Sequence, residues 1–270
     1  MQYFTTLFSR TPRKKIAHAP SGRKIVVGTG WWCSGGRTSW MIGDDLTRSP
    51  EFFALWYRQV MKSLNPLTVF VTDSHSPKKP PFDRFDRVAW VELDRNYGHA
   101  IDIRTGNSKA KLSGFTRSVL LGASFALSCD ADFYIYVEQD CLLRGENLLA
   151  EAIGDQEFDF FCGQRTQGGR GIENRIAAPM LQQSLMIVKG NGLERFITNL
   201  LVARETDGEL SPEVKMERDF KPFGQVLIPY GRSRPIEFSR SHFYAQHLTK
   251  EELGQFLAAE GLRFGDWFKR

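Results

Sequence analysis

Short apolar runs alternate along this chain with longer stretches of helical periodicity, and this alternation limits the folds that the chain can adopt. Residues 50–64 and 109–128 place apolar side chains at the spacing of an amphipathic helix. Strands that alternate with helices form mostly parallel sheets with helices on both faces. The pattern therefore predicts a doubly wound, Rossmann-like α/β domain with a central, mostly parallel sheet flanked by helices. The predicted strands are residues 24–30, 67–73, 88–94, 133–140 and 158–163.

Length and composition agree with a globular domain. The chain has 270 residues, of which 41% are hydrophobic and 25% are charged. No apolar run approaches the roughly 20 residues that a membrane-spanning helix needs. The opening residues, MQYFTTLF, are too short and too polar for the apolar region of a secretory signal. We therefore expect a cytoplasmic protein.

The positive charge of the chain is concentrated at its N-terminal end. The net charge is +5, yet seven of the 36 basic residues precede the first acidic residue, Asp44, which leaves 29 basic against 31 acidic residues in the rest. Residues 1–22 are interpreted as a basic arm, which is compatible with peripheral contact to the inner face of a membrane. The nearly neutral body gives no reason to expect a nucleic-acid partner.

Carboxylates close several of the predicted strands. In open parallel sheets ligands bind beyond the carboxyl ends of the strands. Glu138 and Asp140 follow the most apolar run, FYIYV, and in an extended chain residues i and i+2 point to the same side. Both carboxylates can thus converge on one divalent cation or one ribose. The alternative is that they cap the following turn and helix.

Glycines at the end of the first predicted strand indicate a turn against which a nucleotide can lie. A dinucleotide-binding motif that begins at Gly28 needs a third glycine at position 33, where this chain has Cys33, so an NAD site is not expected. Thr29 and Gly30 remain candidates for contact with another nucleotide.

Three further side chains are candidates for binding phosphate or metal. Arg117 lies in the predicted helix 109–128, close to the edge of the sheet where ligands bind, and can pair with a phosphate. Alternatively, Arg117 lies on a solvated face of that helix and binds no ligand. His242 and His247 precede a last helix that begins with a capping box, and each is either a metal ligand or a packing residue. We favour His247 because the cap orders the chain beside it.

Together these motifs resemble those of the GT-A class of nucleotide-sugar glycosyltransferases, over about residues 24–250. The resemblance lies in the strand KIVVGTGW, a second strand that ends in Asp73, a helix that leads into FYIYVEQDC, a later carboxylate cluster and a late histidine. It implies a single domain in which residues 23–163 bind the nucleotide-sugar and residues 164–270 shape the acceptor site. Asp73 would lie near the base or the ribose.

The resemblance also implies roles for the charged candidates. The D-x-D motif of the family corresponds to Glu138-Gln139-Asp140, so the metal-binding role carries over better to Asp140 than to Glu138. Asp140 would bind Mn²⁺ or Mg²⁺ that bridges the diphosphate, and His247 or His242 would complete the metal shell. The metal and Arg117 would stabilise the leaving nucleoside diphosphate.

A catalytic base is implied if the reaction inverts the sugar. Glu213, Glu217 and Asp219 share one polar segment, and one of them would deprotonate the acceptor hydroxyl. Glu217 is favoured by a slight margin over Glu213. The alternative is a charged surface loop without a catalytic role.

The expected function is therefore metal-dependent transfer of a sugar from a nucleoside-diphosphate sugar to a hydroxyl acceptor, in surface glycan or glycoconjugate synthesis. The acceptor would be a glycan, a lipid-linked molecule or a small molecule. One alternative is a sugar-phosphate nucleotidyltransferase, which needs a basic, glycine-rich loop after the first strand. The other is a non-enzymatic protein that binds glycans or nucleic acid by aromatic stacking through Trp31, Trp32, Trp40 and Tyr97.

Overall fold

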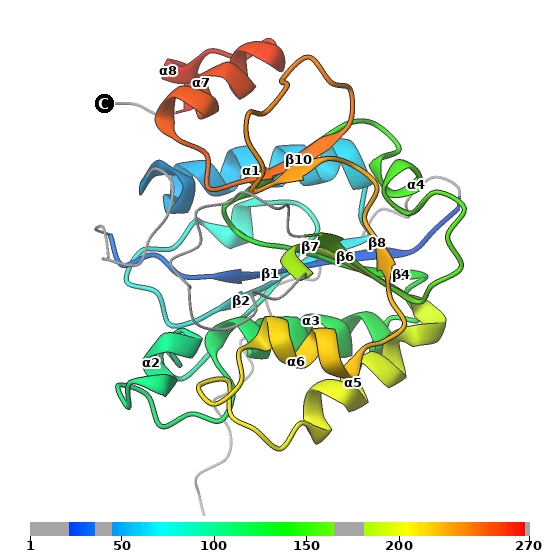
Figure 1. Cartoon of the computed structure of the whole chain (residues 1–270). Coiled ribbons are helices and arrows are strands. Elements are labelled where there is room, and N and C mark those ends of the chain that lie inside the picture. The colour runs from blue at the N-terminus through cyan, green and yellow to red at the C-terminus, as the bar shows by residue number, and fades with distance from the viewer. Residues whose placement is uncertain (1–21, 36–44, 165–180, 268–270) are drawn as a thin grey trace, which may run out of the picture.

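A seven-stranded central sheet lies between two layers of helices in the computed structural model (Figure 1). The structure describes residues 22–35, 45–164 and 181–267. The basic arm predicted at the N-terminus and Trp40 therefore lie outside the described residues, apart from Gly22. No helix in the described ranges has the length and apolar character that crossing a membrane requires.

The order of the central sheet is β3-β2-β1-β4-β7-β6-β8. Its pairs are parallel except for those that β7 makes with β4 and β6. This confirms the predicted mostly parallel sheet flanked by helices. The strands are β1 (Ile25–Trp31), β2 (Thr68–Asp73), β3 (Val88–Glu92), β4 (Phe133–Val137), β6 (Phe160–Gln164), β7 (Leu181–Lys189) and β8 (Gly224–Gln225).

A second, three-stranded sheet covers one end of the central sheet, and the sequence pattern did not predict it. Its order is β5-β10-β9, with β10 antiparallel to β5 and parallel to β9. Because β5 begins directly after the turn that ends β4, the second sheet brings a late segment of the chain to the end of β4. The strands are β5 (Cys141–Arg144), β9 (Tyr230–Gly231) and β10 (Phe243–Gln246).

Helices from the two parts of the chain cover the two faces of the central sheet (Figure 1). One face carries the second sheet and the helices α1 (Pro50–Leu64), α4 (Leu148–Ile153), α7 (Lys250–Ala259) and α8 (Phe264–Trp267). The other face carries α2 (Ala100–Arg104), α3 (Gly114–Ser128), α5 (Leu193–Val202) and α6 (Pro212–Asp219). Short 3-10 helices are η1 (Asp45–Arg48), η2 (Phe82–Arg84) and η3 (Gly190–Gly192).

Local signals explain where the main helices begin. The Ser49 side chain accepts a hydrogen bond from the Phe52 N–H and a proline follows it, so α1 starts at the predicted position. The helix predicted over residues 109–128 begins later in the structure, because Ser113 caps α3 and the helix starts at Gly114. At α7, the capping box predicted from the sequence is present between Thr249 and Glu252.

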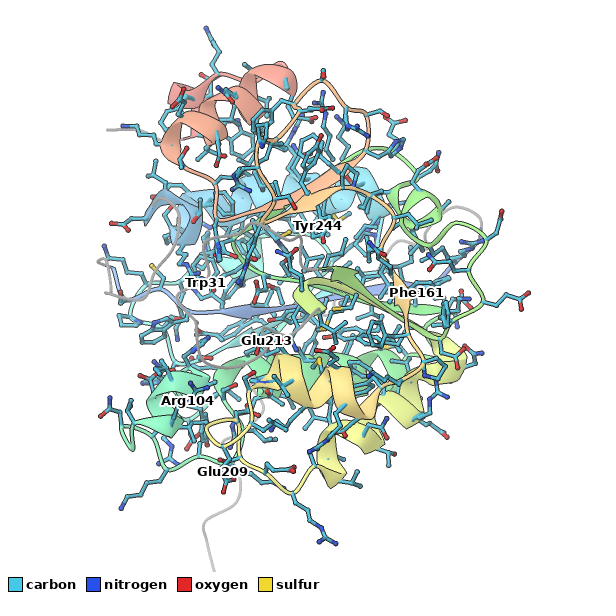
Figure 2. The ribbon with its side chains drawn as sticks, in the orientation of Figure 1. Trp31, Arg104, Phe161, Glu209, Glu213 and Tyr244 are labelled. Carbon is cyan, nitrogen blue, oxygen red and sulfur yellow. The ribbon has the colours of Figure 1, made fainter. Side chains whose placement is uncertain are left out.

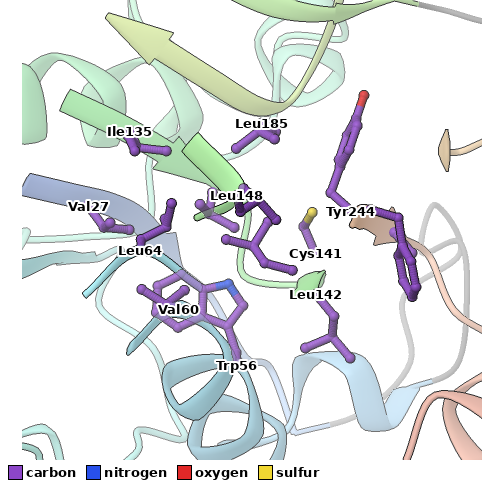
Figure 3. Close-up of a cluster of buried hydrophobic side chains, with 14 of the residues drawn as sticks. Val27, Trp56, Val60, Leu64, Ile135, Cys141, Leu142, Leu148, Leu185 and Tyr244 are labelled. Carbon is purple, nitrogen blue, oxygen red and sulfur yellow. The ribbon is translucent and has the colours of Figure 1, made fainter. Parts of the chain in front are cut away.

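Strand β4 is buried on both faces because each face meets a separate core. Phe133, Ile135 and Val137 pack into the core beneath α1 and the second sheet, part of which is shown in Figure 3. Tyr134 and Tyr136 pack into the core beneath α3 and α5. A fully apolar strand is therefore the expected sequence for this position.

Glu260, at the C-terminal end of α7, connects this helix to α1 and β5. Its side chain is 2% exposed, and its carboxylate lies 3.0 Å from Arg144 Nε and 2.9 Å from Lys62 Nζ. Arg144 belongs to β5 and Lys62 to α1. This ion-pair cluster therefore holds α7 against α1 and β5.

Replacing Glu260 with glutamine should lower the free energy of unfolding by about 3 kcal/mol, because Arg144, Lys62 and Arg58 all lose their buried partner. Urea-induced unfolding measures the change. The matched control is Arg263→Gln, which breaks an exposed pair with Asp266 and should cost less than about 1 kcal/mol. Equal, small losses in both variants would show that Glu260 does not hold α7 in place.

Candidate functional site

The candidate site lies at the turn between β4 and β5. The sequence predicted that Glu138-Gln139-Asp140 would continue the strand, but β4 ends at Val137 and the triplet forms a turn, with Cys141 N donating to Glu138 O at 3.0 Å. Gln139 points away from the two carboxylates and bonds the backbone of Trp32 twice, at 2.6 and 2.9 Å. The turn is thereby fixed to the segment that follows β1.

One buried amide joins the two carboxylates. Gln246, the last residue of β10, donates from Nε2 to Asp140 Oδ1 at 3.0 Å and also to Glu138 Oε2. Its Oε1 accepts from Arg232 Nε at 3.0 Å, which fixes the orientation of the amide. Asp140 and Gln246 are almost fully buried, at 1% and 2% exposure. The predicted convergence of both carboxylates occurs, but through tertiary contact and not through an extended strand.

The second oxygen of Asp140 faces two basic side chains. Arg48 Nη2 donates to Asp140 Oδ2 at 2.7 Å, and His247 Nε2 lies 3.6 Å from the same oxygen. Burial alone would raise the pKa of Asp140, but the charge of Arg48 and the hydrogen bond from Gln246 counter it, and this pKa lies below its ordinary value. Asp140 is therefore an ionised carboxylate at neutral pH.

The neighbours of Asp140 are shifted in the opposite sense. Burial, and then the charge of Asp140, raise the pKa of Glu138 to about 7. Burial lowers the pKa of His247 to about 4, so its imidazole is neutral at pH 7 and can act as a ligand. Arg234 donates to the backbone oxygens of Gln246 and His247 and pairs with Glu252 of α7, so the capped helix orders this segment as predicted.

The opposite side of the site is formed by the α2 and α6 layer. Glu213 lies in the first turn of α6, on the side of that helix that faces the sheet (Figure 2). Its charge contributes to the raised pKa of Glu138, and it also acts on His99, whose pKa is lowered mainly by burial. Arg48 and Arg232 act on both Glu138 and His99. Glu213 is therefore the acidic residue of the second layer whose charge reaches both Glu138 and His99.

A cavity of about 310 Å³ adjoins Asp140. Trp32 and Arg48 lie on its wall, and these residues also bond Gln139 and Asp140 respectively. Its volume is at the lower end of the range for sites that bind small molecules. The described lining residues are Trp32, Cys33, Ser34, Gly35, Asp45, Leu46, Arg48, Ser49, Pro50, Glu51 and Lys78.

The donor atoms around Asp140 suit a divalent cation that keeps part of its shell for a ligand. An ionised carboxylate and a neutral imidazole are both ligands that Mn²⁺ accepts, and Mg²⁺ takes few protein carboxylates and completes its shell with phosphate and water. In the described part of the chain, no group of three or more His, Cys, Asp or Glu side chains is arranged to hold a metal ion. Asp140 and His247 are thus two donors, so a cation held by them would need further ligands from a bound molecule or from water.

Thr29 and Gly30 lie inside the fold. Strand β1 continues to Trp31, and Thr29 is 1% exposed. A Cβ added to Gly30 would lie 2.8 Å from Ser118 Oγ, so this glycine allows α3 to pack closely on the strand. Trp31 is also buried, between Phe53 and Phe82, and its indole is thus unable to stack on a ligand. The candidate positions on this strand have packing roles in the structure.

Asp73 and Arg117 are both engaged within the protein. The fully buried Asp73 accepts a hydrogen bond from Ser76 N at 3.0 Å and pairs with Lys79 at 3.0 Å, which closes the turn after β2. The Arg117 guanidinium lies 3.6 Å from the ring centroid of Tyr97. The structure does not join either residue to the Asp140 cluster, and Tyr97 already stacks on an arginine.

The two candidate histidines occupy opposite ends of β10. His247 follows the strand and faces Asp140, whereas His242 precedes it and bonds Glu146 O at 2.7 Å. The structure therefore brings His247 and not His242 to Asp140. Of the two glutamates in α6, Glu213 acts on Glu138, while Glu217 lies one helical turn further on.

Asp219 is the third acidic residue predicted in that segment. Its carboxylate pairs with Arg218, and its backbone oxygen accepts a hydrogen bond from Asn199 at 2.8 Å. It therefore helps to fasten the C-terminal end of α6 to α5.

The structure adds residues to the site that the sequence did not single out. Arg48, Arg232, Gln246 and His99 come from four separate segments, and none belongs to a motif. Two of them had a neighbour that was noticed, since Arg48 precedes the helix cap Ser49 and Gln246 precedes a candidate histidine. Only the tertiary structure shows that Arg48, Arg232 and Gln246 act on the two carboxylates, and that His99 is affected by Glu213.

Replacing Glu138 with glutamine should stabilise the protein at alkaline pH. Between its ordinary pKa of 4.5 and the folded value of about 7, folded Glu138 keeps a proton that the unfolded chain has lost, so this group lowers stability as pH rises through that window. We expect a gain of about 2 kcal/mol at pH 8 and little difference at pH 4.5, in urea unfolding with EDTA present. A difference that does not change with pH would contradict this assignment.

No protein-family model and no curated protein matches the chain. Similar solved structures include TarS from S. aureus, with 13% identity over 87% of this chain and a TM-score of 0.46. The chain spans 38% of that TarS chain and 64% of a TarS fragment solved in complex with UDP.

Two further similar structures come from other proteins. A glycosyltransferase involved in glycosylation of the major capsid of PBCV-1 is 9% identical over 88% of this chain and 100% of its own, with a TM-score of 0.43. For the 4-diphosphocytidyl-2C-methyl-D-erythritol synthase from Anaerococcus prevotii, the identity is 10% over 76% of this chain and 86% of that chain, with a TM-score of 0.45. The solved structures similar to this fold thus include a glycosyltransferase and a 4-diphosphocytidyl-2C-methyl-D-erythritol synthase.

Proposed function

We propose that this protein is a metal-dependent glycosyltransferase that moves a sugar from a nucleoside-diphosphate sugar to a hydroxyl acceptor. The observation that carries the proposal is the ionised, buried Asp140 beside a neutral His247 and near a cavity whose wall includes Arg48 and Lys78, together with Asp45 and Glu51. This combination suits a ligand with an anionic diphosphate, which binds a divalent cation and a guanidinium at the same time.

The cavity is the proposed site of the nucleoside diphosphate. The apolar surface of Trp32 is suited to a base or a ribose, and Arg48 and Lys78 supply positive charge on the same wall. Asp140 and His247 would hold Mn²⁺ or Mg²⁺, which when bound supplies positive charge to the departing diphosphate. Gln246 keeps the two carboxylates in place by donating to both.

Glu213 is the proposed base for an inverting transfer. It lies in the layer opposite Arg48, it is half-buried, and its charge contributes to the raised pKa of Glu138. The acceptor hydroxyl would therefore enter from the side of α6, which belongs to the half assigned to the acceptor, and give its proton to the Glu213 carboxylate. The acceptor class remains the one expected from the resemblance, a glycan, a lipid-linked molecule or a small molecule.

The nucleotidyltransferase alternative has less support from the residues after β1. The described part of that loop, Trp32–Gly35, carries no basic residue, whereas nucleotidyl transfer needs cations at this position to hold the triphosphate. The products separate the two reactions, because nucleotidyl transfer releases pyrophosphate and glycosyl transfer releases a nucleoside diphosphate.

Replacing Asp140 with asparagine should weaken Mn²⁺-dependent binding of UDP, GDP or CDP by more than about tenfold, because the metal loses its anionic ligand. Isothermal titration calorimetry with Mn²⁺ and with EDTA measures this effect. Asp266→Asn, which changes an exposed carboxylate, is the matched control and should bind as the wild type does. Unchanged Mn²⁺-dependent binding in the Asp140 variant would refute the proposed metal role.

Replacing Glu213 with glutamine should lower kcat by about 100-fold or more and leave donor binding intact, because the base is lost and the donor site is not. Release of the nucleoside diphosphate measures kcat, and calorimetry measures donor binding. Glu217→Gln is the matched control on the same helix and should keep most of the activity. The reverse result would assign the base to Glu217.

A further inference from the structure

Arg48 belongs both to the Asp140 cluster and to the cavity. It is the last residue of η1, directly before the cap of α1, and its side chain is 17% exposed. Nη2 lies 2.7 Å from Asp140 Oδ2, and the residue also lines the cavity beside Trp32 and Lys78. One guanidinium therefore reaches the carboxylate and the space proposed for the diphosphate.

Both carboxylate oxygens of Asp140 already have partners within the protein. Oδ1 accepts from Gln246 at 3.0 Å, and Oδ2 accepts from Arg48 at 2.7 Å and faces His247 at 3.6 Å. A cation bound by Asp140 would compete with the guanidinium for Oδ2 and would also be repelled by it, strongly so in a buried site. Metal and Arg48 are therefore competitors for one oxygen.

We propose that Arg48 neutralises Asp140 in the unliganded protein and is exchanged for the metal when the donor binds. The released guanidinium then pairs with the diphosphate in the adjoining cavity, where an arginine can bind two phosphate oxygens at once. This inference rests on the proposed function, and it adds a residue that binds the donor and links it to the metal.

The exchange makes metal binding and nucleotide binding interdependent. Metal alone must displace Arg48 into the cavity, where it gains no phosphate and meets the carboxylates of the described wall, Asp45 and Glu51, whereas metal with a nucleoside diphosphate also gives the guanidinium phosphate oxygens to bind. The metal should therefore bind weakly by itself and more tightly with the nucleotide, and by linkage the nucleotide should depend on the metal to the same factor.

The test measures Mn²⁺ affinity by calorimetry, and by electron paramagnetic resonance of the free ion, in wild type and in Arg48→Gln. With Mn²⁺ alone, the variant should bind about tenfold more tightly than wild type, because the competitor is gone. With saturating Mn²⁺, the same variant should bind UDP or GDP about tenfold more weakly. Arg263→Gln, which removes an exposed arginine, should match wild type in both measurements.

These opposite effects separate the exchange from a loss of structure, because a misfolded variant would bind both ligands less well. Arg48→Lys provides a second check, since it keeps the positive charge and loses the paired geometry. It should hold Mn²⁺ alone almost as weakly as wild type and bind the nucleotide less tightly. Circular dichroism confirms that each variant is folded.

The outcomes also distinguish this inference from the proposed function. Wild type that binds nucleotide only with Mn²⁺, together with an Arg48→Gln variant whose affinity for Mn²⁺ alone is unchanged, overturns the exchange and leaves the proposed function standing. Wild type that binds neither Mn²⁺ nor any nucleotide overturns both. Weaker Mn²⁺ binding by Arg48→Gln would make Arg48 a support of the metal site and would also overturn the exchange.

Discussion

The candidate site depends on the turn by which the chain passes from the buried strand β4 to β5. Strand β4 is covered on both faces, so its carboxyl end must either stop or turn while its polar groups find partners inside the protein. The chain turns at Glu138–Asp140 and enters the second sheet, whose last strand ends in Gln246. The amide of Gln246 joins the two carboxylates, and Arg232, Arg48 and His247 gather around this pair.

The pKa values of Glu138 and Asp140 are shifted in opposite directions. Glu138 and Asp140 are both buried, yet Arg48 donates a direct hydrogen bond to Asp140 and acts on Glu138 only through its charge, so the pKa of Glu138 is raised and that of Asp140 is lowered. Burial also keeps His247 neutral. The site thus combines an ionised carboxylate, a neutral imidazole and two guanidinium groups, those of Arg48 and Arg232.

The two helical layers contribute different chemistry to the proposed reaction. The layer of α1 supplies Arg48, the cavity wall and, through α7, the ordering of His247. The layer of α6 supplies Glu213. A donor held against the first layer and an acceptor approaching from the second would meet at the end of β4, which is why the turn between β4 and β5 is the proposed centre of the reaction.

The sequence by itself determined the α/β class, the helix that follows Ser49, the capped last helix and the importance of Glu138 and Asp140. These features follow from local causes, namely hydrophobic periodicity, capping side chains and an apolar strand that ends in carboxylates. The candidates Thr29, Gly30 and Asp73 followed from strand ends alone, and the structure uses them for packing and for a turn. Only the tertiary structure showed that His247 and not His242 faces Asp140, and only it brought Arg48 and Gln246 to that carboxylate. Such contacts join residues about one hundred positions apart in the sequence. No local sequence pattern predicts them, because the packing of distant segments brings these residues together.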